Sequence, residues 1–315
     1  MRTASTTTIS ALCLAGLLLA PAARAQTADD EPPENGRTRT LGGHTYLPSE
    51  LVRQPFTASS IGSLTGFGYA NLRITPPNGS PISYQLGMLS QGFDLQVGIT
   101  PWWSVRGAAS GQVLSGVNFV SVLDAGTSVS YNAELGTTFS WAHRDRVRMG
   151  LSIDARYQPE LNFNIANALV RSVLASRVDA STLLTSSQQL WIGAAWQVAF
   201  TPHRFLGVFG ELRYWHVMAK EGDDPTSYGT FSGGLGLSLD FHAVTPLPVG
   251  LMGAWRVTAD VRPGSDLRHE VSAAFYYTGR RHLVFGPEAA IALVPVSPQA
   301  SVFDIQGVLV LRYYF

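Results

Sequence analysis

The feature that most constrains the fold of this chain is an alternation of apolar and polar residues that recurs over most of its length. In residues 129–141 the odd positions are mostly apolar, from Val129 to Trp141, and the even positions are polar or glycine. Residues 147–157 repeat the pattern after a short polar turn. A strand points successive side chains to opposite faces, so each run predicts a strand with one apolar and one polar face. Two such runs joined by a few residues predict a β-hairpin.

The same pattern predicts about twelve strands between residue 62 and the C-terminus. They are expected at about 62–74, 84–99, 102–113, 128–141, 147–157, 188–200, 205–218, 229–242, 250–262, 267–278, 283–294 and 301–315. Pro287 cannot donate to a ladder and argues against the eleventh of these strands. Short connections alternate with mostly longer ones, of which residues 158–187 form the longest. This arrangement is typical of an all-β transmembrane antiparallel up-and-down β-barrel.

The last strand gives a second indication of a membrane barrel. Gly307, Leu309, Leu311 and Tyr313 share one face with Phe315, the last residue. The strand resembles the C-terminal targeting strand of the Gram-negative outer-membrane β-barrel superfamily, which includes porin-like and transporter-like proteins. The resemblance implies the outer membrane of a Gram-negative bacterium, contact with outer-membrane lipids, and recognition by the barrel-assembly machinery through the strand that ends at Phe315.

An even number of strands places both termini on the short-turn side of such a barrel, which is the periplasm. The alternative architecture is a secreted β-sandwich, whose strands also alternate. A β-sandwich would not explain why the terminal strand carries alternate aromatic residues.

The N-terminal residues differ from the rest of the chain. Residues 1–25 have a positive start at Arg2, an apolar run and small residues at the end, which predicts a secretory signal peptide. The only cysteine, Cys13, lies in this stretch, so the mature chain is expected to form no disulfide. The remainder divides into a periplasmic N-terminal segment, residues 26–60, and a transmembrane barrel, residues 61–315.

Two segments outside the predicted strands bear on whether the barrel interior is open. Residues 26–40 are polar, charged and rich in proline, so disorder is expected there. Residues 41–60 include apolar side chains that fit no spanning strand, and we expect them to pack against or inside the periplasmic mouth of the barrel. In residues 158–187, apolar side chains at helical spacing predict a short helix, either folded into the pore as a constriction or lying on the outer rim.

The polar face of the strands is expected to line the barrel interior. Acids and arginines occur there in equal number, without the excess of one sign that a strongly selective pore shows. Arg148, Asp154 and Arg156 share the inward face of one strand. With Glu134, Glu211 and Arg213 on other strands, they are expected to form a paired cluster that lines or blocks the path. The predicted lumen-lining residues are Glu134, Arg148, Asp154, Arg156, Glu211, Arg213, Asp240, Arg256 and Asp260.

Composition and motifs exclude several functions. Charged residues make up only 14% of the chain and the formal net charge is zero, so no basic patch for nucleic acid is expected. The sequence has no HExxH motif, no glycine-rich phosphate loop and no cysteine cluster. We therefore predict no catalytic, metal or cofactor site.

We expect a passive channel or transporter for small solutes rather than an enzyme. One alternative is an outer-membrane lipid-modifying hydrolase, in which a histidine such as His216 or His269 would pair with a serine or an acid on an adjacent strand. The other is a closed structural or adhesion barrel that displays its loops. A barrel of twelve strands lies between filled barrels of about eight strands and water-filled porins of about sixteen or more, so strand number does not decide between them.

Overall fold

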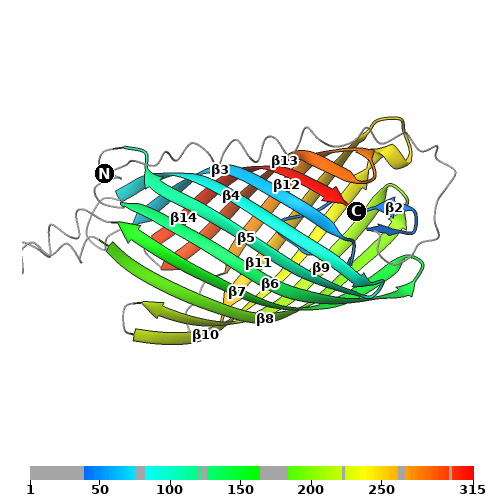
Figure 1. Cartoon of the computed structure of the whole chain (residues 1–315). Helices are drawn as coiled ribbons and strands as arrows, with labels where there is room; N and C mark the ends of the chain where they lie inside the picture. The colour runs from blue at the N-terminus through cyan, green and yellow to red at the C-terminus, as the bar shows by residue number, and fades with distance from the viewer. Residues whose placement is uncertain are drawn as a thin grey trace, which may run out of the picture. The chain divides into compact units, whose positions relative to one another are not determined.

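Twelve antiparallel strands form a closed barrel in the computed structural model of the chain (Figure 1). The structure describes residues 39–74, 82–118, 121, 126–163, 184–221, 224–261, 267–297 and 300–315. The barrel strands are β3 (Ser60–Ile74), β4 (Ile82–Thr100), β5 (Trp103–Gly116), β6 (Thr127–Arg144), β7 (Val147–Phe163), β8 (Leu184–His203), β9 (Leu206–Glu221), β10 (Asp224–Asp240), β11 (Val249–Asp260), β12 (Arg268–Arg280), β13 (Leu283–Ser297) and β14 (Ala300–Tyr314). Each pairs with its neighbour in sequence, and β14 pairs with β3. Closure leaves no unpaired strand edge, as a barrel in lipid requires.

The predicted all-β transmembrane barrel of about twelve strands is confirmed. The connection predicted at 158–187 is shorter than expected, because β7 continues to Phe163 and β8 begins at Leu184. Residues 164–183, which hold the apolar positions of the helix predicted in that connection, lie outside the described residues, as do the predicted signal peptide and residues 26–38. Within the described part of the chain, no helix is both long and apolar enough to cross a membrane.

Strand β13 runs through Pro287, which the sequence suggested would argue against a strand. Its ladder with β14 is continuous there, with Pro287 opposite Leu309. On the other side, Glu288 pairs with Ala274 of β12 and Phe285 pairs with Tyr277. No pair is formed between these two. The missing N–H therefore interrupts one ladder only, and the strand continues because the other ladder holds it.

The two ends of the barrel differ in their connections. Two-residue turns join β4 to β5, β6 to β7, β8 to β9 and β12 to β13 at one end, here called the short-turn end. The fifth connection at that end contains the 3-10 helix η2 (Phe241–Ala243). The C-terminus lies at the short-turn end as well, and the longest connections join strands at the opposite, long-loop end (Figure 1).

The outward face of the strands is apolar. Leu135 on β6 and Phe67 on β3 are each 70% exposed. At the short-turn end the rings of Trp102, Trp103 and Phe139 stack, with centroids 6.3–6.4 Å apart. A large apolar surface with an aromatic rim is unfavourable in water and is typical of a barrel that faces lipid.

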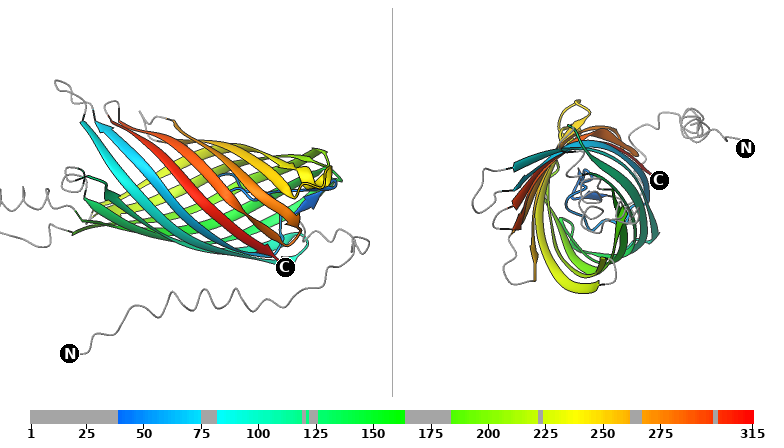
Figure 2. Two further views of the ribbon diagram at one scale, coloured as in Figure 1. Left: turned by 90° about the horizontal axis from the view of Figure 1, so that it is seen from above. Right: turned by 90° about the vertical axis from the view of Figure 1, so that its left-hand side faces the viewer.

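Residues 39–59, here called the plug, lie inside the barrel at the short-turn end (Figure 2, right). The plug begins with a small hairpin of β1 (Thr40–Leu41) and β2 (His44–Thr45). Its turn residues Gly42 and Gly43 have φ angles of 56° and 79°. A two-residue hairpin turn with both central residues in this left-handed region strongly favours glycine, which explains the Gly-Gly pair.

The apolar core of the molecule lies between the plug and the barrel wall. Tyr46 and Leu47 of the plug are fully buried in one cluster with Phe209 and Tyr276 of the wall. Gly207 allows the His44 ring to approach the wall, because a Cβ at this position would lie 2.5 Å from the ring Cδ2. The plug is therefore packed as part of the barrel core rather than held loosely in a water-filled space.

The orientation of the strands can be tested at Leu135, which lies near the middle of β6 on the outward face. Replacing Leu135 with Arg should lower the free energy of unfolding by about 2–4 kcal/mol, because a charge then faces the hydrocarbon core of the bilayer. Unfolding by denaturant in lipid vesicles measures the difference, with Leu135→Ala as the matched control. Equal stability of the Arg and Ala variants would mean that Leu135 does not face lipid.

Candidate functional site

The plug is anchored at the short-turn end by Arg39. Its guanidinium donates from Nη1 to the carbonyl oxygen of Tyr46 at 2.6 Å and from Nη2 to that of Arg281 at 3.3 Å. The same group lies over the ring of Tyr314, 4.4 Å from its centroid. These contacts join the start of the plug to a turn and to the last strand of the barrel, so the described chain enters the lumen at the end where β3 begins.

A fully buried imidazole, that of His44, fixes the plug hairpin. Its Nδ1 lies 3.2 Å from the carbonyl oxygen of Arg204, and its Nε2 lies 3.1 Å from Oγ of Ser238. Burial lowers the pKa of His44 to about 4. The neutral ring therefore donates from Nδ1 to the carbonyl and accepts at Nε2 from the hydroxyl. Because both side chains are fully buried, the pair joins plug to wall and offers no group to a substrate.

The deepest contacts of the plug are made by Arg53. Its Nη1 donates to Asp154 Oδ1 at 2.9 Å, and its Nη2 binds Glu134 Oε1. The backbone N–H of Arg53 donates to Glu211 Oε2 at 2.8 Å. One plug residue therefore meets carboxylates from β6, β7 and β9, which lie on adjoining parts of the barrel wall.

Three wall arginines complete the group around Arg53. Arg156 Nη2 lies 2.9 Å from Glu134 Oε2, and Arg106 Nη1 lies 3.5 Å from Glu134 Oε1. Arg213 Nη1 lies 2.7 Å from Asp154 Oδ2, and its Nε binds Glu211. We call this set the Arg53 cluster; its members are Arg53, Arg106, Glu134, Asp154, Arg156, Glu211 and Arg213.

The plug is also held on the other side of the lumen. Arg312 Nη2 lies 3.2 Å from Oε1 of Glu50, a plug residue, and 2.8 Å from Asp94 Oδ1 of the wall. Arg256 donates from Nη1 to the carbonyl oxygen of Leu51 at 3.1 Å and pairs with a wall carboxylate through Nε. Ionic and hydrogen-bonded contacts therefore secure the plug tip from opposite walls.

The structure brings together five of the predicted lumen residues and separates the others. Glu134, Asp154, Arg156, Glu211 and Arg213 all belong to the Arg53 cluster. Arg256 pairs instead with Glu270 on β12.

Arg148, predicted to share the cluster, lies near the short-turn end. It donates there to Ser140 Oγ at 2.7 Å and to the carbonyl oxygen of Pro101 at 3.0 Å. Asp240 is buried at the same end and accepts from the backbone of His242 at 3.1 Å. Asp260 is half-buried at the long-loop end of β11.

Two members of the cluster, Arg53 and Arg106, are absent from the predicted lumen-lining set, and Arg53 is the one that lies outside the predicted strands. It is the only arginine in residues 41–60, and Glu50 is the only acid there. A single pair of opposite charges in a short apolar segment was the available signal. Its partners lie 81, 101 and 158 residues away in sequence, so nothing local identifies them.

A cavity of about 590 Å³ remains beside the plug. It reaches from Thr258 and Arg268, near the long-loop end, to Ser60 and Tyr314 at the short-turn end. Its charged lining consists of eight arginines, Arg39, Arg53, Arg106, Arg156, Arg213, Arg256, Arg268 and Arg312, and five acids, Glu50, Asp94, Glu134, Glu211 and Glu270. The lining therefore has more cations than anions, whereas equal numbers were predicted for the whole inward face.

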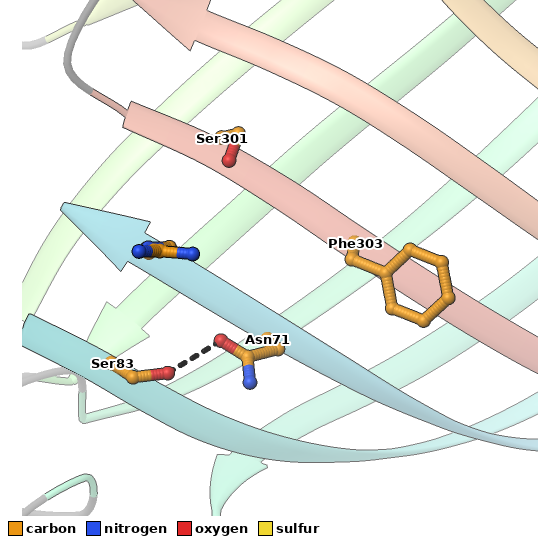
Figure 3. A pocket seen from close by; sticks show the side chains of 5 residues that line it. Asn71, Ser83, Ser301 and Phe303 are labelled. Atoms are coloured by element: carbon orange, nitrogen blue, oxygen red, sulfur yellow. Dashed lines mark hydrogen bonds between the residues drawn. The ribbon is translucent and has the colours of Figure 1, made fainter.

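A second hollow, of about 510 Å³, lies near the long-loop end (Figure 3). It is lined by Asn71, Arg73, Ser83, Ser301 and Phe303. Asn71 and Arg73 are in phase with the exposed Phe67 along β3, so they face outward. This hollow is therefore on the outside of the barrel and does not belong to the lumen. No group of histidine, cysteine and acidic side chains that could hold a metal occurs among the described residues.

Comparison with known proteins bears on the fold alone. No protein-family model and no curated protein sequence matches the chain. The transport unit of the autotransporter AIDA-I from Escherichia coli matches with a TM-score of 0.53 and 11% identity, over 90% of this chain and all 100% of that chain. An outer membrane channel from Pseudomonas putida F1 matches with a TM-score of 0.52 and 12% identity, over 85% of this chain and 99% of that chain.

The fold is that of the outer-membrane β-barrels. Proteins of this fold differ in what they do, so the function of this barrel has to be argued from its interior.

The role of Arg53 can be measured by the accessibility of the plug. Breaking a buried ion pair from one side costs about 3–5 kcal/mol, and the 21% exposure of the Arg53 side chain favours the lower end. Arg53→Gln should therefore raise the labelling rate of a cysteine introduced at Leu47 about a hundredfold. The rate is measured with a water-soluble maleimide on the folded barrel. The label is specific because without residues 1–25 the chain has no other cysteine.

Two comparisons make the result specific. Arg53→Lys, which keeps the charge but loses the planar fork, should give an intermediate rate. Arg73→Gln, on the outer face, should leave the rate unchanged. If Arg53→Gln labels as slowly as the parent, the Arg53 cluster does not hold the plug.

Proposed function

We propose that this protein is an outer-membrane channel for small polar solutes, in which the plug narrows the lumen without filling it. The observation that carries the proposal is the cavity beside the plug. Residues from both halves of the barrel line it, among them Thr258 toward the long-loop end and Tyr314 at the short-turn end. Its walls are charged and hydrogen-bonding, which suits passage of hydrated solutes rather than storage of an apolar ligand.

The arrangement of the plug supports diffusion past it. The chain enters near Arg39, reaches its deepest contacts at Arg53 and returns to the same end, where β3 begins at Ser60. Among the described residues, the plug therefore does not reach the half of the barrel toward the long-loop end. We propose that this arrangement limits the size of the solute that passes and that the charged walls orient it.

The hydrolase alternative receives less support from the site. His216 and His269 lie on β9 and β12, which are not neighbouring strands. Both are exposed and in phase with outward apolar residues. Among the described residues, neither imidazole is hydrogen-bonded to a hydroxyl or a carboxylate, as a catalytic base would be. We propose that the protein is not an enzyme.

A closed structural or adhesion barrel is the second candidate function. The observation that favours it is the number of hydrogen bonds and ion pairs that hold the plug, made by Arg39, His44, Arg53 and Glu50. A plug held by so many contacts would stay in place under ordinary conditions. The two candidates differ in whether ions pass along the cavity.

Conductance in planar bilayers separates these candidates. The intact protein should give small, stable single-channel currents, and replacing residues 41–58 with a glycine-serine linker should increase them several-fold because the lumen widens. Arg73→Gln, outside the lumen, should conduct like the parent. Absence of current from both the intact and the plug-deleted protein would contradict a channel and leave the structural barrel. Current from the plug-deleted form alone would contradict passive diffusion past a resident plug.

We propose that the barrel resides in the outer membrane of a Gram-negative bacterium, with its short-turn end and both termini in the periplasm. Its proposed partners are outer-membrane lipids, the small solutes that pass through it, and the barrel-assembly machinery. The apolar outer face and the fold support the membrane location. The C-terminal strand supports the assembly partner, because Phe315 is 65% exposed and its N–H donates to the carbonyl oxygen of Ser59 at 3.1 Å.

Deleting Phe315 tests this assignment. The terminal strand β14 closes the barrel against β3, so a defect in its recognition should leave unfolded protein in the periplasm. Cell fractionation with heat-modifiable gel migration measures the assembled fraction, with Phe315→Tyr as the matched control that keeps an aromatic ring. Normal assembly of the deletion variant would contradict recognition through Phe315.

A further inference from the structure

The charged side chains of the lumen lie in two layers. The carboxylates are next to the strands and almost covered, with side-chain exposures of 6% for Glu134, 2% for Asp154 and 10% for Glu211. Arginines lie over them toward the cavity, with exposures of 23% for Arg106 and 31% for Arg156. On this part of the wall the surface that a solute meets is therefore made mainly of guanidinium groups, with the balancing negative charge beneath it. The exposed acid of the cavity is Glu50 of the plug, at 29%.

A second group of residues has the same arrangement. Glu270 on β12 is 8% exposed at its side chain, beneath Arg256 at 34% and Arg268 at 46%. This group lies on β11 and β12, separated by β10 from the β9 residues of the Arg53 cluster, and shares no residue with that cluster. Two separate parts of the wall thus present cations to one cavity.

Arg106 shares its paired carboxylate with other cations. The nearest carboxylate oxygen to its guanidinium, Glu134 Oε1, is 3.5 Å away and is already bound by Arg53. The other oxygen of Glu134 is bound by Arg156 at 2.9 Å. Three cations thus share one carboxylate. Surplus charge in a partly enclosed space is unfavourable and attracts a counter-ion strongly, because screening by water is weak there.

We propose that the Arg106–Arg156 face of the cavity is a binding site for a small oxyanion, a solute that carries a carboxylate or phosphate group. The proposal deepens the proposed channel function by naming the solute class, and it rests on that function only for the claim that the anion passes through. Binding itself requires the cavity and the arginines alone.

The chemistry of the site matches this ligand class. A guanidinium presents two parallel N–H groups, which fit two oxygens of a carboxylate or phosphate. Toward the long-loop end the cavity wall adds neutral hydrogen-bonding groups, with Asn132 Nδ2 donating to Ser110 Oγ at 2.7 Å and Thr230 and Ser232 also lining it. An anion entering from that end would meet these groups and Arg268, whose side chain is 46% exposed, before it reached Arg106 and Arg156.

Calorimetric titration of the intact protein in detergent tests the proposal. Inorganic phosphate and acetate should each give saturable binding at low salt, and choline, a cation of similar size, should give none. The double variant Arg106→Gln/Arg156→Gln should bind both anions at least about tenfold more weakly, because charge-assisted hydrogen bonds are lost. Arg73→Gln, an arginine of the outer face, is the matched control and should bind like the parent.

A variant with the opposite expected effect on affinity controls for misfolding of the double variant. Glu134→Gln keeps all the arginines and removes a covered negative charge, so it should bind phosphate more tightly than the parent. Unchanged affinity in the double variant with normal gel migration, weaker binding by Glu134→Gln, or equal binding of choline would overturn the site. Phosphate binding without conductance would contradict the channel and leave the site. Conductance without phosphate or acetate binding would overturn the site and leave the channel.

Discussion

The structure depends on one geometric constraint: a closed ring of twelve strands encloses more space than its own inward side chains fill. Closure is required because every backbone N–H and C=O within the bilayer needs a partner in the protein. The resulting lumen must contain water, protein or both. In this chain residues 39–59 occupy the short-turn end, and a cavity of about 590 Å³ remains beside them. The plug thus fills part of the space that a barrel of this width encloses.

The contacts between plug and wall change in character along the lumen axis. At the short-turn end Tyr46 and Leu47 are packed in an apolar cluster, and the neutral imidazole of His44 is satisfied by a carbonyl and a hydroxyl. At the plug tip Arg53 meets carboxylates instead. Removing Arg53 would leave these buried carboxylates with fewer partners, although wall arginines such as Arg156 would still cover Glu134.

The fold was predictable because its signal is local. Side-chain direction alternates with a period of two whatever the distant contacts are, so each strand could be recognised from its own residues. The inward direction of Glu134 and Asp154 follows from the same rule. This rule fixes the face of a side chain but not its height along the barrel axis. Arg148 therefore shares the face of Asp154 but lies outside the Arg53 cluster, at the start of β7 beside the turn.

The central residue of the site was not predictable for the opposite reason. Arg53 lies in a segment without regular periodicity, and its partners come from three strands that meet only when the barrel has closed. The excess of arginines facing the cavity was hidden in the same way. Counting by face gave equal numbers, but burial separates the two signs, because acids with short side chains remain near the strands while longer arginines reach over them.

The plug has an apolar base, at Tyr46 and Leu47, and an ionic tip, at Arg53. This separation bears on how solutes pass a plug that stays docked. Apolar packing at Tyr46 and Leu47 cannot be exchanged for contacts with a hydrated ion, so it keeps the plug in the barrel. Ionic contacts at the tip can be exchanged, since a bound oxyanion offers a guanidinium the same two oxygens that a carboxylate does. Arg53 and Arg106 share one oxygen of Glu134, so an anion taken up by Arg106 would relieve their mutual repulsion without displacing Arg53. The tip can therefore adjust to a solute while the base stays docked, and passage along the cavity does not require expulsion of the plug.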